Sequence, residues 1–129
     1  FQLTIGSPAD YQPPADFLRR IDAPNIRVTA NPADAVASAD VVNTDVWLSM
    51  GQEGQSAKEA KFKSYQVDNE LLTGAAEGHI VLHCLPAYRG KEISEEVLEQ
   101  HAETIFQQAE NRLHIQKGIM ARMAKHRII

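Results

Sequence analysis

Short apolar runs alternate with short helical segments along the first third of the chain. The apolar runs at residues 1–5, 26–29 and 41–44 are bounded by Gly, Pro, Ser, Asn or Asp, which favour turns. Between these runs, residues 15–22 follow two prolines and residues 32–39 open with one, and proline is tolerated in the first turn of a helix. This order predicts right-handed crossovers and a parallel sheet with helices on both faces.

A further strand is predicted at Ile80-Val81-Leu82, an apolar run typical of a strand buried on both faces of a parallel sheet. It runs into His83-Cys84-Leu85-Pro86, and Pro86 has no N–H to continue a ladder. The run at 41–44 ends in a polar stretch that begins with Asp45. If the two strands are parallel neighbours, their ends lie about 4.8 Å apart. Open α/β sheets bind ligands at the carboxyl ends of their strands, so we expect the functional site there.

The rest of the second half is predicted to be mainly helical. Helices are expected at 56–63, at 69–76 behind a cap at Asp68 or Asn69, and from Ser94 onward. Residues 104–106 favour a short strand, and one long helix is expected from about Ala109. The predicted fold class is therefore α/β: a three-layer, doubly wound, mostly parallel sheet with helices on both faces, plus a long C-terminal helix.

Composition excludes several classes of protein. The 129 residues suit one domain, and the net charge of −4 without a basic block does not favour nucleic acid. No apolar run approaches the roughly 20 residues of a membrane span, and the first residues lack the features of a signal peptide. The single cysteine excludes an internal disulfide and fits a reducing compartment, so a cytoplasmic protein is expected. Nothing in the sequence indicates a cofactor.

Three segments together resemble the ornithine carbamoyltransferase family, in its order and at about its spacing. They are Asp45-Val46-Trp47-Leu48-Ser49-Met50-Gly51, His83-Cys84-Leu85-Pro86 and Ala109-Glu110-Asn111-Arg112. The resemblance covers nearly the whole chain but only the carboxyl-terminal half of the family. It implies transfer of the carbamoyl group from carbamoyl phosphate to the δ-amine of L-ornithine, which yields L-citrulline and phosphate in arginine metabolism.

The resemblance also implies how the domain is organised. Residues 1–129 would form the ornithine-binding domain without its first β-α unit, and without the carbamoyl-phosphate domain that precedes it in the family. The chain has no initiator methionine and opens directly in a strand-like run, which favours this interpretation. We therefore expect the missing domain as a partner, a homotrimer or larger assembly for the full-length protein, and no transferase activity from the isolated chain.

Site residues follow from the same resemblance, residue by residue. It assigns Asp45, Ser49 and Met50 to ornithine, and Cys84, Leu85 and Arg112 to carbamoyl phosphate. Cys84 also stands at the position that handles the proton of the δ-amine. Ser49 would supply polar groups and Met50 an apolar wall for the methylene chain of the substrate. On its own, the Ser-Met-Gly sequence would equally suit an ordinary exposed loop.

The chemistry needs a neutral amine, a stabilised carbonyl oxygen and two substrates held in line. Arg112 suits the second demand, because we expect it in the first turn of the last helix, where free N–H groups favour negative charge. A surface arginine is the alternative, since exposure is usual for arginine. For Cys84, a thiolate that accepts or steers the proton competes with a buried small apolar residue. Covalent catalysis by Cys84 is disfavoured because no paired base is identifiable.

A metal site is not expected. Adjacent His83 and Cys84 do not have a usual chelating spacing, and no second cysteine pair exists. His83 is expected to orient the end of the strand or to tune Cys84. Arg89 is expected on the surface.

Two alternatives to the ornithine enzyme stay open. The first is a carbamoyltransferase for another amine, such as putrescine or an acylated ornithine. Aspartate carbamoyltransferase fits less well, because it usually has His-Pro-Leu-Pro where this chain has His83-Cys84-Leu85-Pro86, and it lacks the Ser-Met-Gly loop. The second alternative is a binding module or an inactive fragment.

Overall fold

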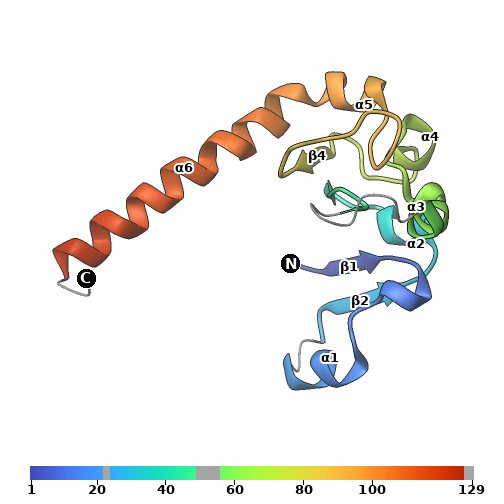
Figure 1. Cartoon of the computed structure of the whole chain (residues 1–129), viewed down its shortest axis with the longest axis horizontal. Coiled ribbons are helices and arrows are strands. Elements are labelled where there is room, and N and C mark those ends of the chain that lie inside the picture. The colour runs from blue at the N-terminus through green and yellow to red at the C-terminus, as the bar shows by residue number, and fades with distance from the viewer. Residues whose placement is uncertain (22–23, 49–55, 127–129) are drawn as a thin grey trace.

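The computed structural model describes residues 1–21, 24–48 and 56–126 (Figure 1). Its four strands are all short: β1 (Leu3–Gly6), β2 (Ile26–Thr29), β3 (Val41–Thr44) and β4 (Ile80–His83). Its α-helices are α1 (Ala15–Ile21), α2 (Pro32–Val36), α3 (Ser56–Phe62), α4 (Asn69–Leu72), α5 (Glu95–Gln100) and α6 (Ala102–Lys125). Two 3-10 turns complete the set, η1 (Ala9–Tyr11) and η2 (Lys63–Tyr65).

The strands pair in parallel, as the alternating pattern predicts. β1 pairs with β2, and β3 pairs with β4 in a register that places Val41 opposite Ile80 and Thr44 opposite His83. Helices cover both sides of the strand layer, so the predicted fold class is confirmed. The described strands nevertheless form two separate two-stranded ladders rather than one continuous sheet.

Side chains cap three of the helices where the sequence places capping residues. Asn31 accepts a hydrogen bond from the Ala33 N–H at the start of α2, and Ser94 accepts one from the Val97 N–H at the start of α5. For α4 the capping residue is Asp68, which accepts from the Leu71 N–H at 2.8 Å. Each cap satisfies a backbone donor that has no partner within its own helix.

Two helices end earlier than expected. α2 ends at Val36 because Ser38 takes a left-handed conformation with a φ of 55°, and its N–H donates to the carbonyl oxygen of Gly74 at 2.7 Å. α4 ends at Leu72, where Thr73 and Gly74 close the last turn. The Ser38–Gly74 bond thus joins the two turns that carry the chain toward β3 and β4.

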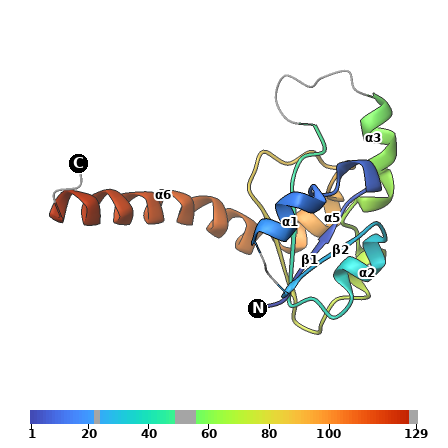
Figure 2. The same ribbon diagram turned by 90° about the horizontal axis from the view of Figure 1, so that it is seen from below.

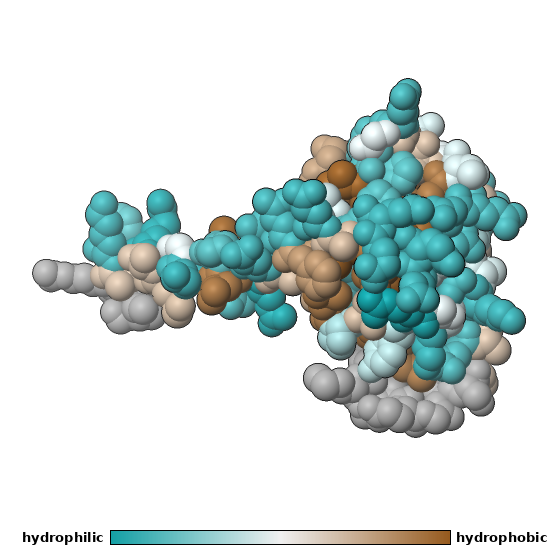
Figure 3. Space-filling model, turned by 90° about the horizontal axis from the view of Figure 1, so that it is seen from above, coloured by the Kyte–Doolittle hydropathy of each residue, from teal (hydrophilic) through white to brown (hydrophobic). Residues whose placement is uncertain are grey.

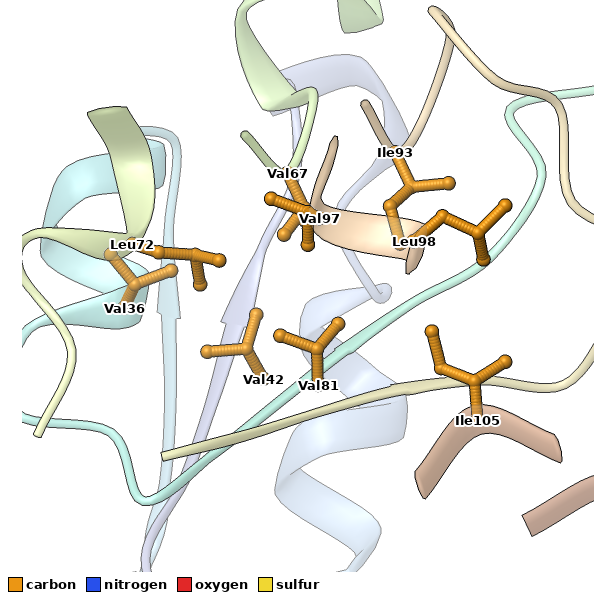
Figure 4. Packing of buried hydrophobic residues seen from close by; sticks show 9 residues of the cluster. All are labelled: Val36, Val42, Val67, Leu72, Val81, Ile93, Val97, Leu98 and Ile105. Atoms are coloured by element: carbon orange, nitrogen blue, oxygen red, sulfur yellow. The ribbon is translucent and has the colours of Figure 1, made fainter. Parts of the chain in front are cut away.

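The buried apolar core surrounds β3 and β4. Its nine members come from β3, β4, α2, α4, α5, α6 and two loop positions, namely Val36, Val42, Val67, Leu72, Val81, Ile93, Val97, Leu98 and Ile105 (Figure 4). No residue of β1 or β2 is buried. The β3–β4 ladder is therefore the rigid part of the molecule, and it carries the carboxyl ends at which we expect the site.

The prediction that β4 is buried on both faces is wrong for this chain. Val81 and His83 are fully buried, but Ile80 is 38% exposed. Its register partner Val41 is 50% exposed on the same face. Apolar strands in parallel sheets normally have both faces covered, so this face of the β3–β4 ladder is only partly covered at its Val41–Ile80 end in the described chain.

The long C-terminal helix begins at Ala102, and the strand predicted at 104–106 is wrong. Thr104 and Ile105 have β-branched side chains, which favour strands locally. Tertiary contacts decide otherwise, because Ile105 is fully buried and the Thr104 hydroxyl donates to the Val81 carbonyl oxygen at 3.1 Å. The first turns of α6 therefore pack on β4.

Beyond this anchor, α6 leaves the body of the molecule as an arm (Figures 1 and 2). Its 24 residues correspond to about 36 Å of helix. Exposed apolar side chains lie along it, at Phe106, Leu113, Ile115, Ile119 and Met120. Figure 3 shows brown patches along this arm between hydrophilic residues. Within the described ranges, no helix is both long and apolar enough to cross a membrane.

Candidate active site

Asp45 and Cys84 meet where β3 and β4 end. Each is the first residue after its strand, and the register of the two strands brings the ends side by side. The Cys84 thiol donates to Oδ1 of Asp45 at 3.1 Å, and the same oxygen accepts the Val46 N–H at 2.7 Å. Both side chains are exposed, so the pair faces incoming ligands at the position where the sequence predicts a site.

The sequence suggests a Cys84 thiolate as one possibility, whereas the structure favours the protonated thiol. Burial raises the pKa of the thiol, and the hydrogen bond to Asp45 and its negative charge raise it further. Arg112 acts in the opposite direction and lowers the pKa, but the net shift is upward. Cys84 is therefore a protonated donor to Asp45 in the unliganded chain.

His83 lies directly beneath this pair and is fully buried. Its Nδ1 accepts the Leu85 N–H at 2.9 Å, so the ring proton is on Nε2, which donates to Oε1 of Glu92 at 3.1 Å. A carboxylate that holds one ring nitrogen fixes the orientation of an imidazole. The expectation that His83 orients the end of the strand agrees with these contacts.

Glu92 is a residue that the sequence analysis did not single out. It is fully buried, and its Oε1 also accepts the Tyr88 N–H at 2.7 Å. Its other oxygen, Oε2, has no hydrogen-bond partner in the described part of the chain. The sequence gives only a weak signal that Glu92 is buried. An acidic residue next to the apolar Ile93 in a short loop indicates burial only when a partner such as His83 is known.

Leu85 takes a conformation that a leucine rarely adopts. Its φ is 56°, in the left-handed region that costs most residues roughly 1–2 kcal/mol, and a cis peptide bond joins it to Pro86. The hydrogen bond from its N–H to His83 holds this turn. The backbone around Cys84 and Leu85 is therefore set by the buried His83–Glu92 pair.

Arg112 does not lie in the first turn of its helix, as the sequence analysis expected. α6 starts ten residues earlier, at Ala102, so the free N–H groups of that helix end are not beside Arg112. The side chain is exposed on the arm, and its positive charge reaches Cys84, whose pKa it lowers. Arg112 therefore acts on Cys84 through its charge, from a different element than either member of the Asp45–Cys84 pair.

Two of the predicted site residues, Ser49 and Met50, lie outside the described residues. Arg89 is on the surface, as expected: its Nη2 donates to Oε1 of Glu99 at 2.6 Å, and its Nε lies 3.9 Å from Glu95. Of the predicted site residues, the structure thus brings Asp45 and Cys84 into contact, with Leu85 held by the buried His83–Glu92 pair and the charge of Arg112 acting on Cys84.

A metal ion fits this cluster poorly. Donor atoms of Asp45, His83 and Cys84 lie within 4.8 Å of one another, which is a possible set of ligands in the described chain. Both ring nitrogens of His83 are already hydrogen-bonded, so a metal would have to break one of these bonds. We keep the prediction that no metal is part of the site.

A hollow of about 440 Å³ lies beside the site, between β1 and β3. Its wall includes Asp45 and Trp47, but neither Cys84 nor Arg112. The volume alone would suit a small ligand, since such pockets span roughly 300–1,000 Å³. The Cys84 thiol thus lies at the strand ends and does not line the hollow.

The fold and these contacts together define an α/β domain with a carboxylate and a thiol at adjacent ends of parallel strands. The chain belongs to the aspartate/ornithine carbamoyltransferase family, since residues 1–123 match the model of its Asp/Orn-binding domain.

Relatives with known names support the family, and the chain spans less than half of their length. The chain is 56% identical over 128 residues to an ornithine carbamoyltransferase of Akkermansia muciniphila, and 46% identical over 127 residues to an anabolic ornithine carbamoyltransferase of Pseudomonas aeruginosa. The match covers 98% of this chain in both cases, but only 42% and 41% of the relatives. The crystal structure of anabolic ornithine carbamoyltransferase from Campylobacter jejuni superimposes with a TM-score of 0.89 at 34% identity, over 98% of this chain and 44% of that one.

Proposed function

We propose that this chain supplies the ornithine side of the active site of an ornithine carbamoyltransferase. In the reaction, the δ-nitrogen of L-ornithine forms a bond to the carbonyl carbon of carbamoyl phosphate. The bond from that carbon to the phosphate oxygen breaks, the nitrogen loses one proton to solvent and one to the departing phosphate, and L-citrulline and phosphate leave. The observation that carries the proposal is the contact between the Cys84 thiol and Asp45 at adjacent strand ends, with the charge of Arg112 acting on it.

Asp45 is the binding group for the substrate amine. A carboxylate stabilises a nearby ammonium, and this carboxylate is already held by the Val46 N–H. Cys84 then stands beside the amine that must lose a proton before it attacks. Because its own proton bonds to Asp45 in the unliganded chain, ornithine has to share or displace that hydrogen bond when it binds.

Arg112 is the group for the carbonyl oxygen. A guanidinium that donates to this oxygen stabilises the negative charge that develops as the amine attacks. The backbone of Leu85, held by His83, is the second contact for carbamoyl phosphate. Removing one such donor typically lowers kcat by about 10²–10³-fold.

The relatives are more than twice as long as this chain, so activity is best tested in a complete protein. We would join the 129 residues to the part of the Akkermansia relative that lies outside the match, and assay citrulline formation. The chimera is expected to turn over, and the isolated chain is not. Clear turnover by the isolated chain would contradict the proposed domain organisation.

Two substitutions in the chimera test the roles of the residues. Arg112→Ala is expected to lower kcat by about 10²-fold or more, because it removes a transition-state donor. Asp45→Ala is expected to act mainly by raising KM for ornithine. Arg122→Ala, near the far end of the same helix, is the matched control and is expected to behave as wild type. Wild-type kinetics in both site variants would refute the assignment.

The identity of the amine is tested in the same assay. Ornithine is expected to be the preferred substrate, ahead of putrescine, N-acetylornithine and aspartate, because the Ser49-Met50-Gly51 sequence suits free α-amino and α-carboxylate groups. Faster turnover of another amine would replace ornithine in the proposal. We further propose a homotrimer or larger assembly for the complete protein, which its mass in solution tests.

A further inference from the structure

The side chain of Glu92 is connected by hydrogen bonds to the turn that carries Cys84 and Leu85. Its Oε1 accepts from Nε2 of His83 at 3.1 Å and from the Tyr88 N–H at 2.7 Å. The His83 ring extends this connection, because its Nδ1 accepts the Leu85 N–H at 2.9 Å. Two consecutive hydrogen bonds thus link the Glu92 carboxylate to the backbone of Leu85.

The backbone of Glu92 is itself held from outside this turn. Its carbonyl oxygen accepts the Val67 N–H at 2.9 Å, and the Val67 carbonyl oxygen accepts the Ser94 N–H at 2.9 Å. The next residue, Ile93, is fully buried in the apolar core. Glu92 therefore has a fixed position, from which its carboxylate can orient the ring of His83.

Stability alone does not explain a carboxylate at this position. Burial of a carboxylate is costly, and apolar residues of similar size often stabilise such a position as well or better. Oε2 of Glu92 adds to the cost, because it is buried without a hydrogen-bond partner among the described residues. The benefit is directional: Oε1 requires the His83 proton on Nε2, which leaves Nδ1 as an acceptor for the Leu85 N–H.

The hydrogen bond to Leu85 controls the orientation of a whole peptide group. The Cys84–Leu85 peptide is trans and planar, so an N–H directed at the buried His83 sets the Cys84 carbonyl oxygen on the opposite side. Leu85 has a φ of 56°, which a leucine keeps only where surrounding contacts hold it. Loss of the contact to His83 would therefore let the turn leave this conformation.

We propose that Glu92 is a positioning residue for carbamoyl phosphate. Acting through His83, it keeps the Cys84–Leu85 turn in the conformation that binds this substrate, and it is itself too deeply buried to touch the substrate. The inference rests on the proposed function, which assigns this turn to carbamoyl phosphate. Asp45 is held separately, by the Val46 N–H at 2.7 Å, so the binding of ornithine should depend much less on Glu92.

Substitutions in the chimera described above test this role. Glu92→Leu removes the acceptor at similar side-chain volume, and Glu92→Ala removes it together with most of the side chain. Glu92→Gln keeps an oxygen acceptor and is expected to retain nearly wild-type kinetics. Leu72→Ala is the matched control, because Leu72 is buried in the same core and its side chain has no hydrogen bond to the turn. The Tm of each variant gives a temperature at which all of them are folded.

The expected result is a change in KM for one substrate only. In Glu92→Leu and Glu92→Ala, KM for carbamoyl phosphate should rise about 5- to 30-fold, the population ratio that corresponds to the cost of a left-handed residue. KM for ornithine should stay within about threefold of wild type, and Leu72→Ala should change neither value. A merely structural role moves neither KM in a folded variant.

Three kinetic results would overturn the proposal. They are an unchanged KM for carbamoyl phosphate in Glu92→Leu, equal increases for both substrates, and an increase in Leu72→Ala as large as that in Glu92→Leu.

NMR of the chain itself tests the link from Glu92 to Leu85 without any substrate. Nitrogen chemical shifts of the His83 ring are expected to place the proton on Nε2 in wild type and in Glu92→Gln. Amide exchange at Leu85 should be faster in Glu92→Leu than in Leu72→Ala, and equal rates in these two variants would exclude the link. If the wild-type chimera makes no citrulline, the proposed function fails, and the assignment of carbamoyl phosphate fails with it. A response of Leu85 in the NMR experiment separates that failure from a missing link.

Discussion

At the scale of single residues, the site depends on charges that oppose one another around one sulfur atom. Asp45 accepts a hydrogen bond from the Cys84 thiol and raises its pKa, whereas Arg112 lowers that pKa. Below them, the buried His83–Glu92 pair holds the Leu85 turn. The charge state of Cys84 is therefore a measurable reporter of this geometry, even in a chain that does not turn over.

Asp45→Asn and Arg112→Gln are expected to shift the reactivity of Cys84 in opposite directions. Asp45→Asn removes a negative charge that opposes the thiolate, so the pKa falls and alkylation by iodoacetamide proceeds at lower pH. Arg112→Gln removes a charge that favours the thiolate, so the pKa rises. The measurement is the pH midpoint of alkylation of the single cysteine. Asp40→Asn and Arg122→Gln are the controls, and equal shifts in a control and its site variant would remove the support for the contact.

Glu92→Ala is expected to destabilise the fold by about 2–3 kcal/mol, because it leaves the buried His83 Nε2–H and Tyr88 N–H without their acceptor. Urea unfolding measures the change. Glu77→Ala, at an exposed turn, is the matched control and is expected to stay within about 0.5 kcal/mol of wild type. A loss no larger than that of the control would mean that Glu92 does not hold His83.

At the scale of elements, the boundaries of β2 and β3 agree with the sequence pattern, because turn-forming residues stop both strands abruptly. The start of α6 was missed because Thr104-Ile105-Phe106 has strand propensity, and burial of Ile105 against β4 outweighs that preference. The early end of α2 depends on the distant Gly74 carbonyl, which no local pattern contains.

The same limit applies to the site. Asp45, Cys84 and Arg112 carry the family resemblance and were identified from sequence. Glu92 was not, because only the folded chain brings its carboxylate to the Nε2 of His83, nine positions earlier. Sequence therefore indicates the groups that meet a ligand more readily than the buried groups that orient them.

The junction of α5 and α6 should make stability sensitive to acid. His101 lies between the two helices, and its ring is 5.5 Å from that of His79. Burial, and then the His79 charge, lower the pKa of His101 in the folded chain. Below its ordinary value of 6.5 the unfolded chain binds this proton more readily, so the stability contributed by His101 is present above that pH and is lost as the pH falls.

His101→Gln is therefore expected to lose less stability than wild type between about pH 7.5 and about pH 5.5. Urea midpoints at the two pH values provide the comparison. His126→Gln, near the exposed end of α6, is the control and should keep the wild-type pH dependence. An unchanged dependence in His101→Gln would show that another group is responsible.

At the scale of the whole molecule, side chains are packed unevenly between the two pairs of strands. The core gathers around β3 and β4, whereas β1 and β2 form a ladder without buried side chains, beside the hollow. The strand-end site lies at the edge of the well-packed half.

The arm of α6 has a mechanical consequence. A helix that is held near one end is displaced most at its other end. In α6 the held part is the short stretch around Thr104 and Ile105. Arg112 lies about two turns beyond this stretch, so a small change in the tilt of α6 already displaces the Arg112 side chain. Any partner that bound the far apolar residues of the arm would thus also set the position of the Arg112 guanidinium, and with it the charge that lowers the pKa of Cys84.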